Sequence, residues 1–288
     1  MTADVSLRDD VKQAGRAFWD ANPCGGRWSS YAEFLDWYRR TEPYMFEVVD
    51  AYDWRGMRVL EVGCGQGPLL NHLPSRGAHV VGIDMSAASL RRSADGAVEL
   101  GWGSQVRVTQ ADAERLPFAA GVFDGVVSFG VLHHTPDTAG SVRELHRVLR
   151  PGGRAVVMLY RSGTPKWFAT RVLRGIGRLI DRRGSSEALV DRTRTVHGVD
   201  DARGTALLEL FGVPTLKAYS NREVRRMFDG FDKVRVRNYQ PGFRRLGDMA
   251  GILRGLSPLL AAIDRVMQQP WGFYQIVYAE RRLNDSAV

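Results

Sequence analysis

The chain has 288 residues, 44% of them hydrophobic and 25% charged, a balance typical of a folded globular protein rather than a disordered or fibrous one. No apolar run reaches the roughly 20 residues that cross a bilayer, and the start, MTADVSLRDD, lacks the basic and apolar regions of a signal peptide, so we expect a cytoplasmic protein. The two cysteines, Cys24 and Cys64, are far apart in sequence and support neither a disulfide framework nor a metal site, so we expect no bound metal.

The first 160 residues change from helical to alternating patterns. Residues 5–20 and 30–52 carry apolar side chains at helical spacing, with the sequence NPCGG between them. From Arg58 onward, short β-branched runs alternate with helical stretches, which predicts a parallel sheet covered by helices on both faces. The strands expected there are 58–62, 79–84, 105–110, 123–130 and 154–160.

After Tyr160 the alternation stops. The basic amphipathic stretch 166–183 predicts a helix that fits either a lid over a binding site or a membrane surface. We favour the lid, because a single helix of this kind without a lipid anchor attaches only weakly to membranes. Ser220 and Glu223 form a capping-box pattern that predicts a helix over 219–231. Two further strands, 233–239 and 273–281, are expected on either side of a helical piece at about 246–268.

Together these elements predict an α/β protein: a Rossmann-like sheet of seven mostly parallel strands with helices on both faces, a helical N-terminal segment and helical lid insertions. The expected organisation has four parts. They are an N-terminal helical cap (1–55), a ligand-binding core (56–160), a basic helical insertion that acts as a substrate lid (161–219), and the C-terminal part of the core (220–288), which carries a helical insertion at about 241–271.

The stretch VLEVGCGQGP places three glycines after the first strand, where they let the main chain turn sharply and approach a ligand closely. Pro68 predicts that a helix begins directly after this loop. The loop has neither the G-K-S/T ending of a phosphate-binding P-loop nor the G-x-G-x-x-G spacing of the dinucleotide fingerprint. Glu61, at the end of the strand, would repel a pyrophosphate but attract a ligand with an ammonium group. A nucleoside triphosphate or dinucleotide is therefore disfavoured.

Two further acids follow the next strands. Asp84 closes the second strand, where this type of fold presents a carboxylate to ribose hydroxyls. Asp112 follows the third strand and is placed to accept a hydrogen bond from an adenine amino group.

These motifs resemble those of the class I methyltransferases that use S-adenosylmethionine (SAM). LEVGCGQG resembles their first motif, GIDMS the ribose-binding acid and QADAERLPF the adenine-binding segment, and the elements FDGVVSFGVLHHTPD and RELHRVLRPGGRAVVMLY follow in order over about residues 56–160. The resemblance implies an enzyme that transfers the methyl group of SAM and releases S-adenosylhomocysteine. The cofactor contacts that it implies are Glu61, Gly63, Cys64, Gly65, Asp84, Met85, Asp112, Ala113 and Phe129.

Three histidines are candidate catalytic residues. His133 and His134 follow the fourth strand, at the edge where this fold binds reactive ligands, and a neutral histidine there would suit a base for a hydroxyl acceptor. The alternative is that the pair only shapes the loop. His197, in the basic insertion, is the next candidate, with a plain surface role as its alternative.

The N-terminal segment and the insertions are rich in aromatic residues, which suggests that they cover a small, partly hydrophobic acceptor. We expect a natural-product or other secondary-metabolite intermediate, with oxygen slightly favoured over carbon or nitrogen as the acceptor atom. The candidate acceptor contacts are Trp19, Trp28, Tyr31, Trp167 and Tyr219. The alternative is that these side chains only pack the additions onto the sheet.

Two other functions remain open. The net charge of +8, concentrated between residues 161 and 245, would suit a nucleic-acid methyltransferase. Against this, GVLHHTPD stands where base-modifying enzymes of this fold usually have an N/D-P-P-Y/F motif. The second alternative is a protein of the same fold whose chemistry is not methyl transfer, such as a cyclase. The sequence leaves open the acceptor atom and whether the protein is a monomer or a homodimer.

Overall fold

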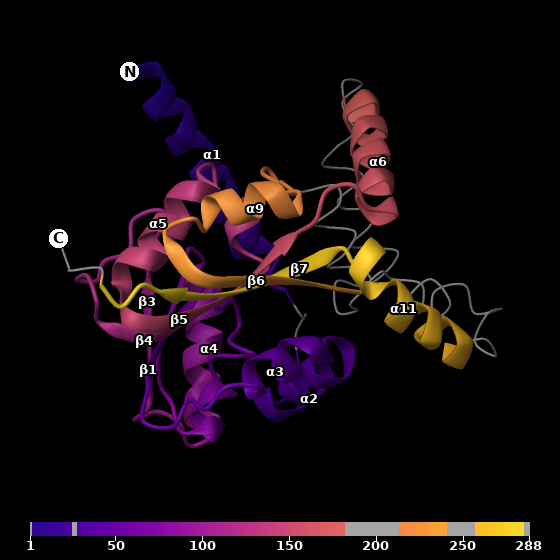
Figure 1. Ribbon diagram of the computed structural model, residues 1–288. Helices are drawn as coiled ribbons and strands as arrows, with labels where there is room; N and C mark the ends of the chain where they lie inside the picture. Colours follow the sequence, from indigo (N-terminus) through magenta and orange to yellow (C-terminus); the bar gives the residue numbers. More distant parts are fainter. Residues whose placement is uncertain (1, 25–27, 182–212, 241–256, 285–288) are drawn as a thin grey trace.

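The computed structural model describes residues 2–24, 28–181, 213–240 and 257–284. These residues form a seven-stranded sheet in the order β3-β2-β1-β4-β5-β7-β6 (Figure 1). Strands β1 to β5 are parallel, and β7 lies antiparallel between β5 and β6. The mostly parallel seven-stranded sheet is therefore confirmed. The strands are β1 (Arg58–Val62), β2 (His79–Asp84), β3 (Val106–Gln110), β4 (Phe123–Phe129), β5 (Leu149–Tyr160), β6 (Phe231–Tyr239) and β7 (Tyr274–Arg281).

Helices cover both faces of the sheet (Figure 1). On one face lie α2 (Tyr31–Thr41), α3 (Pro43–Asp50) and α4 (Ala87–Glu99), and on the other lie α5 (Thr138–Val148) and α9 (Asn221–Met227). Successive side chains of a strand point to opposite faces, so each central strand contributes to two hydrophobic cores.

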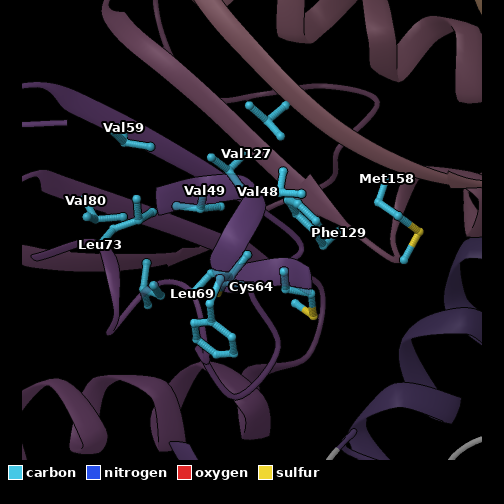
Figure 2. Close-up of a cluster of buried hydrophobic side chains, with 14 of the residues drawn as sticks. Val48, Val49, Val59, Cys64, Leu69, Leu73, Val80, Val127, Phe129 and Met158 are labelled. Carbon is cyan, nitrogen blue, oxygen red and sulfur yellow. The ribbon is translucent and has the colours of Figure 1, made fainter. Parts of the chain in front are cut away.

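In β1, Val59 belongs to the core under α3, and Leu60 belongs to the core under α5. Figure 2 shows the first of these cores, in which Val48 and Val49 of α3 lie close to the side chains of the central strands. Burial on both faces holds the central strands in place, so the loops at their carboxyl ends start from a rigid base.

Three further helices lie outside this layered core. They are α1 (Thr2–Ala21), α6 (Pro165–Asp181) and α11 (Ser257–Trp271). Figure 1 shows α6 and α11 projecting from the sheet at the right of the view. The expected helices 166–183 and 246–268 overlap α6 and α11, and their remaining residues lie outside the described ones.

The helix expected over 30–52 is wrong, because the segment forms two helices. Glu42 lies between α2 and α3 with φ −127° and ψ 52°, outside the helical region. Pro43 explains the break, since a proline ring has no N–H for the helical ladder and restricts the residue before it.

The helix expected from Pro68 is also wrong. Residues 68–72 form turns and lead into a short 3₁₀ helix, η1 (Leu73–Arg76). Pro74, which cannot donate to the ladder, and Gly77, which has a left-handed φ of 82°, prevent a longer helix.

Candidate functional site

A cavity of about 250 Å³ opens at the carboxyl ends of the parallel strands. It is bounded by the glycine loop (Gly63–Gly67), by the ends of β1, β2 and β4, and by one face of α1. This is the edge at which sheets of this type bind ligands. All nine residues predicted to contact the cofactor line the cavity: Glu61, Gly63, Cys64, Gly65, Asp84, Met85, Asp112, Ala113 and Phe129.

Four of the five amides of the glycine loop are already hydrogen-bonded within the protein. The N–H groups of Gly63 and Cys64 donate to the Ile83 carbonyl at 2.7 and 2.9 Å, and that of Gly67 donates to the Cys64 carbonyl at 2.8 Å. Gly65 N–H donates to Asp84 Oδ2 at 2.8 Å. A phosphate-binding loop works by presenting free N–H groups to the anion, so this loop is poorly suited to a phosphate.

The glycines instead allow a ligand in the cavity to approach the main chain closely. Gly65 has a φ of +54°, and a Cβ added there would meet nothing within 4 Å, so the main chain borders open space in the cavity. Gly63, with a φ of +72°, is constrained by packing, because an added Cβ would lie 2.2 Å from a methyl carbon of Val131.

Glu61 is a buried acid at the end of β1, and only 3% of the residue is exposed. Its Oε2 atom has no hydrogen-bond partner within the described residues. Burial, and secondarily the charge of Asp84, raise the pKa of Glu61 well above its usual range. An unsatisfied buried carboxylate that lines a cavity fits a ligand with an ammonium group, because such a group would stabilise the ionised form.

Asp84, at the end of β2, shapes the loop as well as the cavity wall. Besides the bond from Gly65, its Oδ1 accepts a hydrogen bond from Ser86 N–H at 2.8 Å. Burial raises the pKa of this carboxyl. Backbone hydrogen bonds from Ser86, Gly65 and Met85 lower the pKa but do not outweigh burial, and ligand hydroxyls can use the lone pairs that these bonds leave free.

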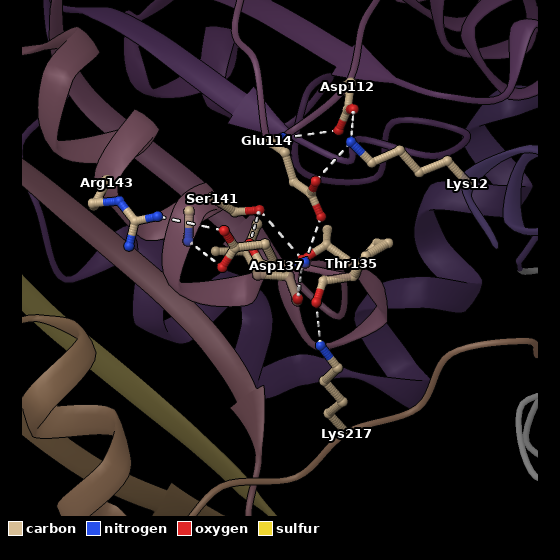
Figure 3. Close-up of polar contacts among 11 residues, drawn as sticks. Lys12, Asp112, Glu114, Thr135, Asp137, Ser141, Arg143 and Lys217 are labelled. Atoms are coloured by element: carbon tan, nitrogen blue, oxygen red, sulfur yellow. Dashed lines mark hydrogen bonds and ion pairs between the residues drawn. The ribbon is translucent and has the colours of Figure 1, made fainter. Parts of the chain in front are cut away.

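Asp112 is joined to α1 by an ion pair that the sequence did not reveal. Lys12 Nζ lies 2.6 Å from Asp112 Oδ2 and 2.6 Å from Glu114 Oε2 (Figure 3). An adenine amino group at this acid would therefore share the carboxylate with Lys12. No sequence signal distinguishes this lysine from the other polar residues of α1.

The ion pair belongs to a wider polar network (Figure 3). Glu114 Oε1 accepts a hydrogen bond from Asp137 N–H at 2.6 Å, and Lys217 Nζ donates to the Pro136 carbonyl at 2.6 Å. The network connects α1, the segment after β3, the loop after β4 and the segment before α9.

The two adjacent histidines occupy different environments. His133 is fully buried, stacks on Tyr160 with ring centroids 3.8 Å apart and is not among the residues that line the cavity. His134 lines the cavity, its Nδ1 lies 2.8 Å from the Thr215 carbonyl oxygen, and burial lowers its pKa to about 4. His197 lies outside the described residues.

One of the five predicted acceptor contacts lines the cavity. Trp19 of α1 does so, with its ring at 5.5 Å from His134 in an edge-on arrangement. The other four pack elsewhere: Trp28 lies beside Trp37 with ring centroids 5.7 Å apart, Tyr31 donates to the Gln66 carbonyl at 2.6 Å, Trp167 packs against the hydrophobic core, and Tyr219 donates to Thr138 Oγ1 at 2.8 Å. For these four side chains, the placement favours packing.

Sequence reasoning missed most of the aromatic residues that do line the cavity. They are Trp37, Tyr38, Tyr44, Tyr160 and Tyr274. Tyr160 ends β5 and Tyr274 begins β7, and these two residues are paired across the antiparallel strands with stacked rings 5.5 Å apart. Only the strand order brings them together, since 113 residues separate them in sequence.

Within the described residues, no group of three or more His, Cys, Asp or Glu side chains is arranged to hold a metal ion. In the same part of the chain, no helix has the length and apolar character needed to cross a membrane.

Comparison with known proteins agrees with this geometry. Residues 60–157, which include the glycine loop, all three acids and both adjacent histidines, match the family described as "Methyltransferase domain". Residues 60–157 therefore match a methyltransferase domain, of the class I, SAM-dependent type that the sequence motifs resemble.

Two curated relatives show how far the sequence similarity extends. The chain is 40% identical to the ubiquinone biosynthesis O-methyltransferase of Pseudomonas aeruginosa (strain UCBPP-PA14) over 101 residues, which are 34% of this chain and 42% of that protein. It is 33% identical to methyltransferase GfsG of Streptomyces halstedii over 172 residues, 58% of this chain and 61% of that protein. The chain thus spans less than two thirds of each relative.

Solved structures show that the fold is shared over more of the chain. The [4+2]-cyclase SpnF aligns with a TM-score of 0.59 and 20% identity, covering 95% of this chain and 96% of that one. An S-adenosylmethionine-dependent methyltransferase from Mesorhizobium loti aligns with a TM-score of 0.53 and 20% identity, covering 83% of this chain and 96% of that one. At these identities the likeness concerns the fold alone.

Proposed function

We propose that the protein is an enzyme that transfers the methyl group of SAM to a small, partly hydrophobic acceptor. The observation that carries this proposal is a single cavity with two different ends. Glu61, Asp84 and Asp112 lie around the glycine loop, whereas Trp19, His134 and Tyr160 form an aromatic wall within the same cavity. A positively charged cofactor and an apolar acceptor would each find matching surroundings there.

The residues of the acidic end fit the parts of SAM. Glu61 would bind the ammonium group, Asp84 the ribose hydroxyls, and Asp112 with Ala113 the adenine. When bound, SAM supplies a methyl group on a positively charged sulfur. The carboxylates would stabilise that positive charge, and the glycines would let the main chain approach it. Lys12 and Trp19 place α1 over the cavity, where it would keep water out.

His134 is the candidate catalytic residue that the structure favours among the three predicted histidines. It lines the cavity and is neutral at pH 7, since its pKa is about 4. The relatives' names favour oxygen as the acceptor atom: besides the ubiquinone enzyme, the chain is 38% identical over 100 residues to the 27-O-demethylrifamycin SV methyltransferase of Amycolatopsis mediterranei, 34% of this chain and 37% of that protein. The rifamycin relative also supports an acceptor from secondary metabolism.

The insertion after β5 is proposed as a lid over the acceptor. Arg174 of α6 donates to the Val213 carbonyl at 2.9 Å. Val213, Pro214 and Thr215, on the far side of the insertion in sequence, line the cavity. The hydrogen bond between Arg174 and Val213 thus joins α6 to the segment that begins at Val213 and lines the cavity.

The charge of the cavity argues against a nucleic acid as the acceptor. Its lining carries four carboxylates, from Glu42, Glu61, Asp84 and Asp112, and the Lys12 ammonium, which is paired with Asp112. A polyanion would be repelled by this lining.

The proposal is tested by incubating the protein with methyl-labelled SAM and small-molecule extracts of its source. Labelled product formed together with an equal amount of S-adenosylhomocysteine is expected. A new product without S-adenosylhomocysteine would instead indicate chemistry other than methyl transfer. Failure of calorimetry to detect SAM binding would overturn the proposal.

A further inference from the structure

We propose that Glu42 binds a protonated amino group of the methyl acceptor, so that the enzyme selects acceptors that carry a basic amine. This inference rests on the proposed function and narrows the class of acceptor. It makes Glu42 a specificity-determining residue that is separate from the three acids assigned to SAM.

Glu42 lines the cavity on the side of the sheet away from the cofactor acids. Glu61 and Asp84 lie at the ends of β1 and β2, and Asp112 follows β3. Glu42 Oε2 accepts a hydrogen bond from Gln240 Nε2 at 3.1 Å, and Gln240 directly follows β6 at the opposite edge of the sheet. Because β4, β5 and β7 lie between β1 and β6, an ammonium group at Glu42 would not occupy the position of the SAM ammonium group at Glu61.

Aromatic side chains accompany Glu42 in the cavity lining. Tyr44, two residues later, stacks on Tyr274 with ring centroids 5.4 Å apart, and Tyr274 stacks on Tyr160 at 5.5 Å. The aromatic wall therefore continues from the acceptor end to the neighbourhood of Glu42. The lining also includes two aromatic residues of α2, Trp37 and Tyr38. The faces of such rings attract cations. A carboxylate beside several rings thus suits a protonated amine on an apolar body.

The charge at this end of the cavity favours the same class of ligand. Among the described residues that line the cavity, Glu42 is the one charged side chain outside the cofactor end, where Lys12 is paired with Asp112. Gln240 donates through a neutral amide, so its bond orients the carboxylate without cancelling its charge. An acceptor with a carboxylate or phosphate would be repelled by Glu42, whereas an ammonium group would form a charge-assisted hydrogen bond with it.

The main chain holds Glu42 at the junction of α2 and α3. Its N–H donates to the Tyr38 carbonyl at 2.8 Å, and its carbonyl accepts from Met45 N–H at 3.1 Å. Glu42 is the N-cap residue of α3, yet its side chain makes no capping hydrogen bond and contacts Gln240 instead. The Gln240 carbonyl in turn accepts from Phe273 N–H at 3.2 Å, directly before β7. A carboxylate positioned in this way needs little rearrangement to bind a ligand.

The amine bound at Glu42 would anchor the acceptor and would not itself receive the methyl group. A protonated amine has no lone pair, so it cannot attack the methyl carbon of SAM. Another atom of the same acceptor must therefore reach the sulfonium, and no bond forms or breaks at Glu42. Binding energy from this contact would serve to orient the acceptor.

The first test compares two probes on the wild-type protein saturated with S-adenosylhomocysteine, which fills the cofactor end. Benzylamine is protonated at pH 7, and benzyl alcohol is its neutral analogue of nearly the same size. In ligand-observed NMR titrations, we expect benzylamine to bind about 10- to 100-fold more tightly than benzyl alcohol. Similar affinities for the two probes, or no binding of benzylamine, would overturn the inference.

Variants of Glu42 separate charge from shape. Glu42→Gln has nearly the same size and can still accept from Gln240, but it carries no charge. Its benzylamine affinity should fall about 5- to 100-fold, and its benzyl alcohol affinity should change less than about twofold. Glu42→Asp keeps the charge on a shorter side chain and should retain part of the benzylamine affinity. Equal benzylamine affinity in wild-type protein and in Glu42→Gln would contradict the inference.

The matched control is Glu47→Gln. Glu47 belongs to α3, as close neighbours of Glu42 do, but it is exposed and is not among the residues that line the cavity. The substitution removes the same charge from the same part of the chain, so benzylamine should bind with unchanged affinity. A loss as large as in Glu42→Gln would mean that the overall charge of this region, and not a contact at Glu42, attracts the amine.

The outcomes distinguish this inference from the proposed function. If S-adenosylhomocysteine does not bind, the methyltransferase proposal fails, and the probes are then compared in Glu61→Gln, which lacks the other buried acid. A loss of benzylamine affinity on adding Glu42→Gln to that variant would still support the amine site. An unchanged affinity there, or in the protein saturated with S-adenosylhomocysteine, would reject the amine site alone.

Discussion

Asp84 holds the glycine loop from the neighbouring strand, because its Oδ2 accepts a hydrogen bond from Gly65 N–H at 2.8 Å. The same carboxylate accepts from Ser86 N–H through Oδ1. One side chain thus fixes the turn that approaches the ligand and presents its remaining lone pairs to the cavity.

Replacing Asp84 should therefore remove both a ligand contact and the support of the loop. We expect Asp84→Ala to weaken SAM binding more than 100-fold, since about 3 kcal/mol or more of charged hydrogen bonding is lost. Asp84→Asn, which keeps one acceptor oxygen, should weaken it about tenfold. Calorimetry measures both.

The matched control is Asp124→Ala. Asp124 likewise accepts a backbone bond, from Arg58 N–H at 2.7 Å, but lies at the start of β4, at the opposite edge of the sheet from the cavity. Its loss should lower the free energy of unfolding and leave the SAM dissociation constant unchanged. A SAM dissociation constant that is unchanged in Asp84→Ala would refute the cofactor site.

Glu61 is expected to destabilise the protein when no ligand is present. Its pKa is raised by burial, so the folded state holds its proton to higher pH than the unfolded state does, and stability falls as pH rises above about 4.5 toward the folded pKa. Glu61→Gln should therefore raise the melting temperature of the ligand-free protein at pH 8, and the gain should shrink toward pH 4.

The same substitution should weaken SAM binding at least tenfold, because the neutral amide can accept a hydrogen bond from an ammonium group but cannot form an ion pair with it. Thermal unfolding with and without SAM, followed by circular dichroism, shows both effects. This role of Glu61 would be contradicted if Glu61→Gln had a lower melting temperature than the wild-type protein without ligand and bound SAM with the same affinity.

The sheet and the acidic end of the site were predictable because their signals are local. Each strand is a short β-branched run, and Glu61 and Asp84 lie at strand ends that the periodicity locates. In the aromatic wall, Trp19 and His134 were predicted from the sequence, but Tyr160 was not, because it meets Tyr274 only through the antiparallel insertion of β7 beside β5. The two histidines could not be told apart in sequence either, since their difference in burial depends on how the loop after β4 packs against Tyr160.

The ion pairs of Lys12 should hold α1 against the core. Its two ion pairs, with Asp112 and Glu114, are half-buried and join the helix to the segment after β3. Lys12→Met keeps the aliphatic stem but removes both pairs, at a cost of about 1–3 kcal/mol. Amide hydrogen exchange in α1 should then be about 5- to 100-fold faster, and SAM should dissociate faster.

Arg16→Met supplies the control on the same helix, because the pair between Arg16 and Asp20 is solvent-exposed and contributes little. Exchange in α1 should be nearly unchanged in this variant. Equal exchange rates in Lys12→Met and wild-type protein would show that α1 is held by its apolar contacts instead.

His134 should make the protein sensitive to acid. The pKa of His134 is about 4 in the folded state, below the value of about 6.5 in the unfolded state. Between these two pH values the ring is protonated in the unfolded state but neutral in the folded state. The contribution of His134 to the free energy of unfolding is therefore fully present above pH 6.5, and it falls by up to about 3 kcal/mol as the pH drops toward 4. The wild-type free energy of unfolding should decrease over this window more steeply than that of His134→Asn, and urea titrations at several pH values measure the slopes. Parallel slopes would mean that His134 is not buried as a neutral ring.

Tyr31 of α2 contacts the glycine loop, and substitutions of two helical glycines, Gly96 and Gly175, test whether this contact positions the loop. A Cβ added to Gly96 in α4 would lie 2.3 Å from the ring of Tyr31, whose hydroxyl holds the Gln66 carbonyl of the glycine loop. Gly96→Ala should therefore displace Tyr31, lower the free energy of unfolding by about 1–3 kcal/mol and weaken SAM binding several-fold. Gly175→Ala in α6 is the matched change, since a Cβ there meets nothing within 4 Å, and the better helix propensity of alanine should leave stability unchanged or up to about 1 kcal/mol higher. Urea unfolding and calorimetry on both variants decide the matter: if Gly96→Ala binds SAM as tightly as Gly175→Ala does, Tyr31 packs the helices together without positioning the loop.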